Sequence, residues 1–204
     1  EEACEIEINR LKKPIGKQDQ YACAMGDVNL IKYNSSGLVL LKKDNKIRKF
    51  INMTLSNSLL IYSGIARESK FILKDQNNKI KKKVIESEMF EIRDICKNVY
   101  KEILNYNGKN FNNLSDFFIK NLNETWEIKK TLHKNMTNLI IDEIIKIIHL
   151  SCGDKVGIKL LGAGAGGFII VSGIRNMQFL KKALLKKKIL FFNASIDTDG
   201  SVFL

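Results

Sequence analysis

Stretches with helical periodicity stand between groups of short β-rich runs in this chain, and their order constrains the fold more than any other feature. Apolar residues recur at spacings of three and four over residues 67–83, 85–103 and 128–148, which predicts amphipathic helices. Runs of β-branched and aromatic residues precede and follow these helices. Because strands and helices that are segregated along a chain favour an α+β fold, we expect a layered arrangement of antiparallel sheet and helices.

The predicted strands form one group before the long helices and one group after them. They cover residues 28–33, 38–41, 47–51 and 59–62 in the first group, and 156–161, 168–171, 189–196 and 201–204 in the second. Asp197-Thr198-Asp199-Gly200 is expected to turn the last two strands into a hairpin. Further helices are expected at residues 1–13, ending before Pro14, and at residues 115–122 and 176–188.

The composition is that of a folded protein with a sizeable core. Of the 204 residues, 45% are hydrophobic and 27% are charged, which is too apolar for a disordered chain. The longest uncharged stretch, Leu160–Ile174, has 15 residues and includes five glycines, so no membrane-spanning helix is expected. The first residues show neither a basic nor an apolar leader segment, so no signal peptide is expected either. These features predict a cytoplasmic protein.

The charged and sulfur-containing residues give few signs of a metal or nucleic-acid site. The four cysteines lack C-x-x-C spacing and there are only two histidines, so no zinc site is predicted and the thiols are expected to be reduced. The net charge of +12 would suit a polyanion, yet the lysine clusters at 81–83 and 186–188 have no interleaved aromatic residues. A solvated basic surface is favoured over a nucleic-acid groove, and it would also attract a phosphorylated small molecule.

A glycine-rich segment, Gly162-Ala163-Gly164-Ala165-Gly166-Gly167, satisfies the pattern G-x-G-x-x-G of dinucleotide-binding loops. In that fold the loop opens a helix, and an acidic residue follows about twenty positions later. Here the β-branched run Phe168–Val171 follows directly, and the acidic position falls among Lys186–Lys188. A Walker motif is absent as well. Two interpretations remain: a loop whose bare backbone N–H groups face a ligand, which we favour, and a tight crossing of two backbones.

A polar cluster follows Pro14, where Lys17, Gln18 and Asp19 precede a run of small residues. We expect residues 21–25 to be buried, which would place Asp19 in a partly enclosed space. A carboxylate in such a space can accept a proton from an attacking hydroxyl group or orient that group. A lysine two positions away can keep the carboxylate ionised or neutralise a phosphate group. The alternative is an exposed loop of ordinary polar composition.

Together these segments resemble the GHMP small-molecule kinases, and within them the heptose phosphate kinases. The residues that carry the resemblance are Gly16–Ala22, Asn29–Ile31, Tyr62–Arg67, Trp126–Asp142 and Lys159–Phe168. They occur in the family's order and span nearly the whole chain. The resemblance implies a GHMP kinase-type layered sandwich of antiparallel sheet and helices. Residues 1–55 would be the remainder of the N-terminal domain with the catalytic aspartate, and residues 56–204 would form the C-terminal domain.

The resemblance also implies an activity, the transfer of the γ-phosphoryl group of ATP to a hydroxyl group of a sugar phosphate. The favoured substrate is D-glycero-D-manno-heptose 7-phosphate, and the cofactors are ATP and Mg²⁺. The resemblance assigns Asp19 as the catalytic residue and Gly162, Ala163, Gly164, Ala165, Gly166 and Gly167 as the loop beside the phosphoryl-transfer site. Lys17, Gln18 and Arg67 would lie near the phosphate of the sugar, where fixed cations suit a dianion. Trp126, Lys129 and Thr137 are expected to serve packing.

The sequence also departs from the family. The GGGTD-like stretch and the GLGSSSS-like loop, which in the family hold the ATP phosphates and magnesium, do not occur in the 204 residues. Because phosphoryl transfer depends on positioning and charge neutralisation, we expect the C-terminal part of a kinase, without metal ligands of its own and inactive alone. The alternatives are a non-catalytic sugar-phosphate-binding remnant and a basic nucleic-acid-binding protein. A homodimer is left open, and neither a membrane nor a nucleic acid is the expected partner.

Overall fold

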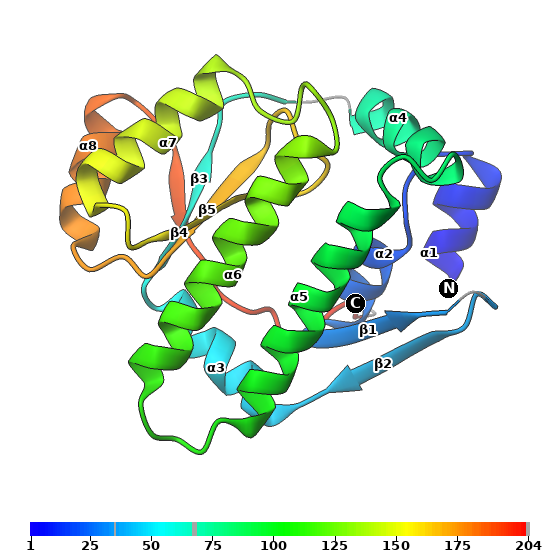
Figure 1. Ribbon diagram of the computed structural model, residues 1–204, viewed down its shortest axis with the longest axis horizontal. Helices are drawn as coiled ribbons and strands as arrows, with labels where there is room; N and C mark the ends of the chain where they lie inside the picture. The colour runs from blue at the N-terminus through cyan, green and yellow to red at the C-terminus, as the bar shows by residue number, and fades with distance from the viewer. Residues whose placement is uncertain (35, 67–68, 203–204) are drawn as a thin grey trace. The chain divides into compact units, whose positions relative to one another are not determined.

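The computed structural model describes residues 1–34, 36–66 and 69–202. The chain forms two compact units, one of residues 1–53 together with the segment from residue 195 onward, and one of residues 54–194 (Figure 1). Both units combine helices with antiparallel sheet, so the expected α+β class is confirmed. The assignment of residues 1–55 and 56–204 to two kinase domains stays a prediction. None of the helices in the described ranges has the length and apolar character needed to cross a membrane.

The second unit contains a sheet of four antiparallel strands in the order β4-β5-β3-β6. The strands are β3 (Ser58–Tyr62), β4 (Gly157–Leu160), β5 (Phe168–Ser172) and β6 (Phe191–Asn193). Strand β3 lies between β5 and β6, with Leu60 opposite both Ile170 and Phe192. This confirms the predicted strands 59–62, 156–161 and 168–171. The short β6 lies within residues 189–196, which were expected to form a longer strand.

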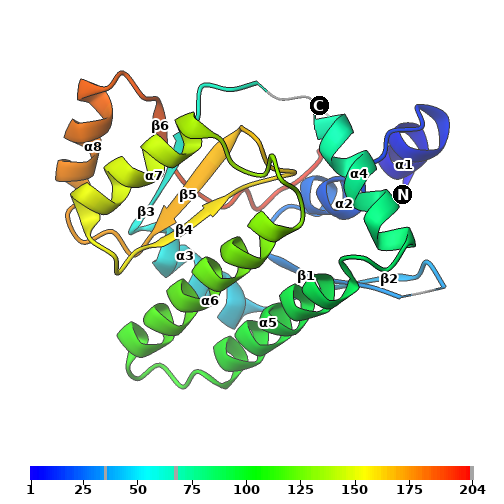
Figure 2. The ribbon, with the colours of Figure 1, turned by 45° about the horizontal axis from the view of Figure 1, so that its top comes forward.

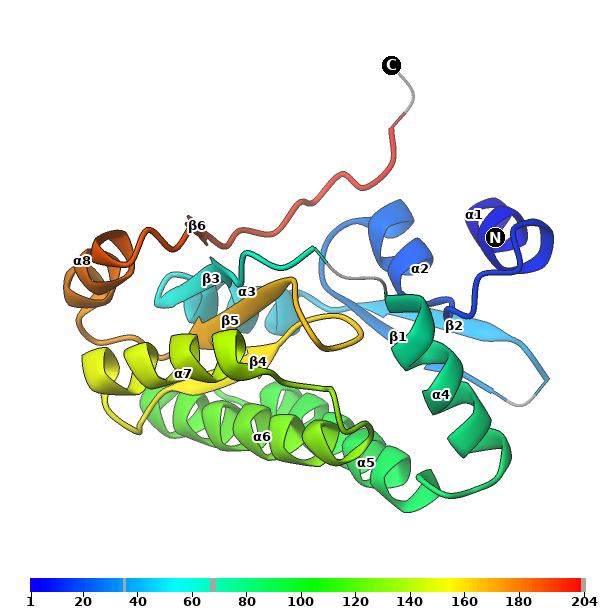
Figure 3. The same cartoon turned by 90° about the horizontal axis from the view of Figure 1, so that it is seen from above.

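Helices connect and cover these strands. They are α4 (Ser69–Lys81), α5 (Glu86–Asn105), α6 (Phe111–Thr131), α7 (Leu139–Cys152) and α8 (Met177–Lys186). Helix α6 lies along β4 with α5 beside it (Figure 2), and α7 lies beside α8 (Figure 3). Because side chains alternate between the two faces of a strand, one face of the sheet supplies the core. Its buried residues include Leu59, Ile61, Ile158, Ile169 and Val171, which share one cluster with residues of α6, α7 and α8.

The side chain of Asn123 on α6 pairs with the free edge of β4. Asn123 Nδ2 donates to Val156 O at 3.0 Å, and Ile158 N donates to Asn123 Oδ1 at 2.7 Å. The helix backbone also comes close to the strand, since a Cβ on Gly157 would lie 3.5 Å from the backbone Cα of Ile119. An edge strand presents unpaired backbone groups that need partners. Here a helix side chain supplies them.

The first unit is built from short elements. They are α1 (Glu2–Cys4), the π-helix η1 (Glu5–Arg10), α2 (Gln18–Met25), the antiparallel pair β1 (Asn29–Tyr33) and β2 (Val39–Lys43), and α3 (Asn45–Leu55), which continues into the second unit. The segment from residue 195 onward passes the end of α2. A Cβ on Gly26 would lie 2.4 Å from Gly200 N, so the two backbones touch, and Ser201 N donates to Ala24 O at 3.2 Å.

The predicted strand at residues 47–51 is wrong, because these residues lie within α3. The side chain of Asp44 accepts a hydrogen bond from the backbone N–H two residues later at 2.9 Å, which starts the helix. Ile47 and Phe50 are both buried and three positions apart, as on one face of a helix. The β-branched and aromatic character of the run therefore misled the prediction.

The predicted single helix over residues 128–148 is also wrong. Helix α6 begins earlier, absorbing the expected short helix at 115–122, and ends at Thr131, while α7 begins at Leu139. Asn138 caps α7, its side chain accepting hydrogen bonds from the N–H groups of Ile140 and Ile141. Leu139, at the start of α7 and within the range expected to form an amphipathic helix, is 87% exposed.

The predicted terminal hairpin does not form in the described residues. Residues 195–202 contain no strand, and residues 203–204 lie outside the described part. Asp197 O instead accepts a hydrogen bond from Asp27 N at 2.6 Å. The segment is therefore bonded to the corner between α2 and β1 and not to the predicted strand partner.

Asn123→Ala tests the pairing of the β4 edge. Val156 and Ile158 are 2% and 3% exposed, so the substitution leaves a buried C=O and a buried N–H without partners. Since each such group costs about 1–3 kcal/mol, we expect the free energy of unfolding to fall by about 2–4 kcal/mol in urea denaturation. Asn112→Ala, at an exposed position of the same helix, is the control and should change it by less than about 0.5 kcal/mol. Equal losses in the two variants would contradict the pairing.

Candidate functional site

The glycine loop connects β4 to β5, and backbone hydrogen bonds fix its two ends. Leu161 N donates to Phe168 O at 2.8 Å across the base of the loop. Ser63 N donates to Gly167 O at 2.9 Å, and Gly167 N donates to Ile65 O at 3.2 Å. These bonds bring the segment after β3, which carries part of the family resemblance, against the end of the loop.

The inner half of the loop is held by the connection between α6 and α7. Ala165 N donates to Met136 O at 2.9 Å, and Asn138 Nδ2 donates to Ala165 O at 3.1 Å. Gly164 and Gly166 are buried and leave no room for a side chain. A Cβ on Gly164 would lie 2.2 Å from Met136 Sδ, and one on Gly166 would lie 2.9 Å from a backbone oxygen. A tight backbone crossing, the less favoured interpretation of the loop, describes this half.

The outer residues of the loop, Gly162 and Ala163, are open to a ligand. Gly162 is exposed and Ala163 half-buried, and neither N–H group donates a hydrogen bond to any residue that the structure describes. Beside them lies a pocket of about 220 Å³ lined by three apolar side chains, Gly162 and Gly167. Backbone donors with no side chain in front of them can bind an anionic oxygen. The geometry therefore allows ligand binding at the outer half of the loop.

Lys129 reaches from α6 to the start of the loop. Its Nζ donates to Leu160 O at 3.3 Å and to Gly162 O. The sequence prediction assigned this lysine to packing, whereas its ammonium group makes polar contacts with the loop. Lys129 lies three residues after Trp126, which is 4% exposed, and residues three apart lie on the same face of a helix. This spacing indicates that Lys129 lies on the helix face that is turned toward the sheet.

Lys159 on β4 is a second lysine near the loop that the sequence prediction did not assign to the site. It lies opposite Ile170 of β5, and burial lowers the pKa of its ammonium group below the ordinary value. A cation in apolar surroundings lowers stability, because the charged form loses its hydration.

The predicted catalytic cluster lies in the first unit, at the start of α2. Lys17 directly precedes the helix, Gln18 is its first residue, and Asp19 lies in its first turn. All three residues are exposed and α2 contains no buried residue, so the expected burial of residues 21–25 and the enclosed space for Asp19 are wrong. The sequence of α2 lacks the apolar spacing that would give the helix a buried face.

The surroundings of the other predicted substrate residues differ from expectation or are not described. Lys17 lines a hollow of about 380 Å³ together with Glu1, Glu2 and Glu5, whose carboxylates disfavour a phosphate there. Arg67 lies outside the described residues. Asp19 and the glycine loop belong to different units, so their meeting at one site stays a prediction.

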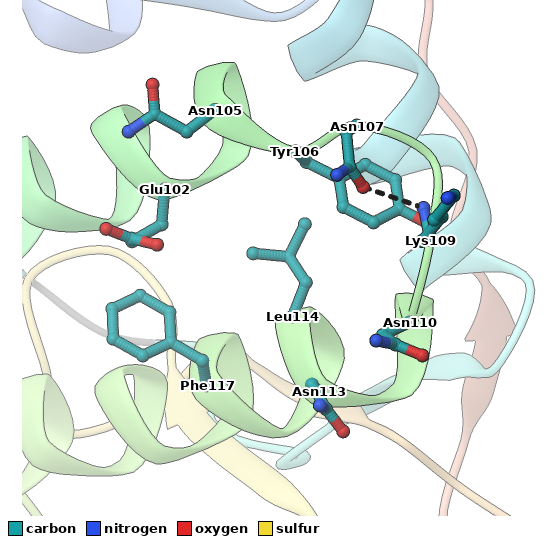
Figure 4. A pocket seen from close by; sticks show the side chains of 9 residues that line it. All are labelled: Glu102, Asn105, Tyr106, Asn107, Lys109, Asn110, Asn113, Leu114 and Phe117. Atoms are coloured by element: carbon teal, nitrogen blue, oxygen red, sulfur yellow. Dashed lines mark hydrogen bonds between the residues drawn. The ribbon is translucent and has the colours of Figure 1, made fainter.

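A separate pocket of about 290 Å³ lies between the end of α5 and the start of α6 (Figure 4). Its lining includes the amide side chains of Asn105, Asn107, Asn110 and Asn113, and Asn107 Oδ1 accepts a hydrogen bond from Lys109 N at 3.1 Å. The fifteen residues of α6 between Leu114 and Lys129 correspond to roughly 22 Å, so this pocket is remote from the glycine loop. One lysine and one glutamate give it no excess of positive charge for a phosphate.

The packing of the inner loop can be tested with two glycines of similar conformation. Gly164 has φ +107 and a filled Cβ position, whereas Gly108 has φ +87 and nothing within 4 Å. We expect Gly108→Ala to cost about 1–2 kcal/mol of unfolding free energy from backbone strain alone. Gly164→Ala should cost about 1–3 kcal/mol more, because the methyl group meets Met136. Equal losses in urea denaturation would show that the inner loop is not tightly packed.

Lys159→Met tests the cost of the buried ammonium group. Its lowered pKa means that the unfolded chain binds the proton more tightly, so the wild type gains stability as the pH rises toward 10.5, the value for an unperturbed lysine. We expect the variant to be more stable than the wild type at pH 7 and the difference to shrink by pH 10, as measured by thermal unfolding. A difference that does not change with pH would exclude this explanation.

Comparison with known proteins tests the predicted resemblance. No family model matches the chain. The chain is 27% identical over 200 residues to the D-glycero-alpha-D-manno-heptose 7-phosphate kinase of Campylobacter jejuni. The matched region covers 97% of this chain and 56% of that kinase. The chain therefore spans about half the length of the curated relative that it matches.

Solved kinase structures share the fold. A D-glycero-D-manno-heptose 1-phosphate kinase from Bacteroides thetaiotaomicron has a TM-score of 0.59 at 20% identity, over 99% of this chain and 54% of that one. The mevalonate kinase of Methanococcus jannaschii has a TM-score of 0.53 at 22% identity, over 76% of this chain and 43% of that one. The predicted resemblance is thus confirmed, since the chain has the fold of GHMP-type kinases and is similar in sequence to a heptose phosphate kinase.

Proposed function

We propose that this chain takes part in the ATP-dependent phosphorylation of a sugar phosphate, with D-glycero-D-manno-heptose 7-phosphate as the acceptor. The observation that carries the proposal is the similarity to a heptose 7-phosphate kinase along 97% of the chain. The outer half of the glycine loop supports it, because Gly162 and Ala163 offer backbone N–H groups that are free to bind phosphate oxygens. Fixed backbone donors of this kind stabilise the charge of a phosphoryl group during transfer.

The proposal gives a role to the outer residues of the glycine loop, to the predicted catalytic residue and to two of the predicted substrate-binding residues. ATP supplies the phosphoryl group, and the N–H groups of Gly162 and Ala163 bind its oxygens. Asp19 orients the acceptor hydroxyl group and accepts its proton. Its place in the first turn of α2 suits an ionised carboxylate, because the positive end of the helix dipole lies there. Gln18 and Arg67 hold the phosphate that the sugar already carries, whereas the carboxylates of the hollow beside Lys17 disfavour this role for Lys17.

The side chains that the structure describes do not form a metal site of their own. Across the described ranges, no three His, Cys, Asp or Glu side chains are grouped so that they could hold a metal ion. The GGGTD-like and GLGSSSS-like stretches are also absent from the sequence. We therefore propose that turnover requires a phosphate cradle outside these 204 residues. The cytoplasmic location and the state of association stay predictions.

Turnover by the chain alone is the first test. With ATP, Mg²⁺ and heptose 7-phosphate, we expect the 204-residue chain to release ADP no faster than a protein-free control. A form extended by the reading frame directly upstream should show acceptor-dependent turnover. Acceptor-dependent ADP release by the 204 residues would contradict the need for a further cradle. Calorimetric binding of heptose 7-phosphate without turnover in either form would favour the sugar-phosphate-binding remnant instead.

Asp19→Asn tests the role of the carboxylate in the form that turns over. Loss of a general base lowers kcat by roughly 100-fold to 10,000-fold, and we expect an effect in this range. Asp116→Asn, which neutralises another exposed helix aspartate, is the control and should leave kcat unchanged. If Asp19→Asn retained wild-type turnover, the proposed catalytic role of this residue would be wrong.

A further inference from the structure

The ammonium group of Lys129 donates to two nearby backbone carbonyl groups at the point where β4 becomes the glycine loop. Nζ donates to the carbonyl oxygen of Leu160, the last residue of β4, at 3.3 Å, and to that of Gly162, the first glycine of the loop. Both acceptors are backbone groups of the second unit, as is the helix that carries the lysine. The contact therefore joins α6 to the outer half of the loop.

A residue with a long side chain is needed to make this contact. Along β4, Val156 and Leu160 are four residues apart, which corresponds to about 13 Å. Along α6, Asn123 and Lys129 are six residues apart, which corresponds to about 9 Å. Asn123 pairs with the start of this edge and Lys129 with its end. The four-carbon side chain of lysine covers the remaining distance of about 4 Å.

The contact has a direct consequence for the N–H group of Ala163. The carbonyl of Gly162 and the N–H of Ala163 belong to one peptide unit, which is planar and points these two groups in opposite directions. Fixing the carbonyl oxygen on α6 therefore fixes the direction of the N–H, which points away from Lys129. A donor on the carbonyl also polarises the peptide unit and strengthens its N–H as a donor.

We propose that Lys129 is a positioning residue that orients the Ala163 N–H for a phosphate oxygen, without touching the phosphate itself. The proposal rests on the proposed function, because it needs a phosphate at the outer half of the loop. This role differs from the packing role predicted from the sequence. If Lys129 served packing alone, methionine, which has a similar length and no charge, could replace it without a loss of phosphate binding. The inner anchor of the loop, Ala165 N to Met136 O, is independent of Lys129.

Solution NMR on the isotope-labelled 204-residue chain tests the contact in the wild type first. We expect a scalar coupling between Lys129 Nζ and the carbonyl carbon of Gly162, transmitted through the hydrogen bond from Nζ to the carbonyl oxygen. Lys129→Met should then shift the Ala163 amide resonance and lower its order parameter, while the Ala165 amide resonance stays unchanged. Lys129→Arg should restore the resonance position and the order parameter of the Ala163 amide, because a guanidinium group can donate to the same carbonyls.

Titration with inorganic pyrophosphate measures the effect on anion binding. In the wild type we expect the Gly162 and Ala163 amide resonances to shift at millimolar pyrophosphate. Lys129→Met should weaken the binding about tenfold, the equivalent of one charge-assisted hydrogen bond. Lys129→Arg should stay close to the wild type. Lys120→Met, an exposed lysine of the same helix, is the control for the loss of one positive charge and should have little effect.

The outcomes separate this inference from the proposed function. Pyrophosphate binding in Lys129→Met that equals the wild type, with an unchanged Ala163 resonance, would overturn the positioning role and leave the loop as the phosphate site. No response of Gly162 and Ala163 to pyrophosphate in the wild type would overturn the loop's role in the proposed function, and the inference with it. Should Lys129→Met not fold, absence of the Lys129 to Gly162 coupling in the wild type would still overturn the inference.

Discussion

Strand β4 lies at the edge of the four-stranded sheet, and the backbone groups on its free side need partners if they are to stay buried. Helix α6 supplies them through two side chains, Asn123 at the start of the strand and Lys129 at its end. This pairing fixes α6 along the strand and fixes the direction in which the chain leaves β4. Because the glycine loop begins at that point, its orientation follows from how the edge is closed.

The two halves of the loop meet different requirements. The inner half is anchored to the α6–α7 connection and to the segment after β3, and Gly164 is needed there because Met136 occupies the place of a side chain. The outer half has glycine and alanine where ligand access requires a bare backbone. Rigid anchors on both sides of exposed donors reduce the reorganisation needed when an anion binds. The structural and the ligand-binding interpretations therefore apply to neighbouring residues of one loop.

The sequence patterns predicted the elements that are decided locally and failed where distant contacts decide. Strands β3 and β5 were predicted because β-branched runs bounded by turn residues have few alternatives. Residues 47–51 satisfy both strand and helix patterns, and the cap at Asp44 decides for the helix. The break near residue 138 depends on a cap and on Asn138 bonding Ala165, twenty-seven positions later. The hydrophobic periodicity of a sequence cannot predict such a long-range contact.

The candidate site shows the same limit. The glycine loop could be located from composition, whereas Lys129 could not, because only the folded unit brings α6 to the end of β4. The family resemblance assigns Asp19 as the catalytic residue, which stays a prediction. The expectation that it is enclosed relied on small residues being buried, and small residues are equally common in exposed helices.

Magnitudes indicate what the loop would contribute to phosphoryl transfer in the proposed function. A hydrogen bond to a charged group contributes about 1.5–3 kcal/mol, so two donors contribute about 3–6 kcal/mol. A dissociation constant of 1 mM corresponds to about 4 kcal/mol, and the loop alone therefore accounts for millimolar binding of a phosphate group. Affinity for ATP must come mostly from other residues. In the proposed function the loop would contribute through orientation, because donors that are already aligned act on the charge that develops during transfer and require no rearrangement at that moment. On this argument the direction of the Ala163 N–H affects transfer more than the strength of its hydrogen bond does. Lys129, which fixes the direction of that peptide unit, would therefore have a larger effect than its positive charge alone would produce.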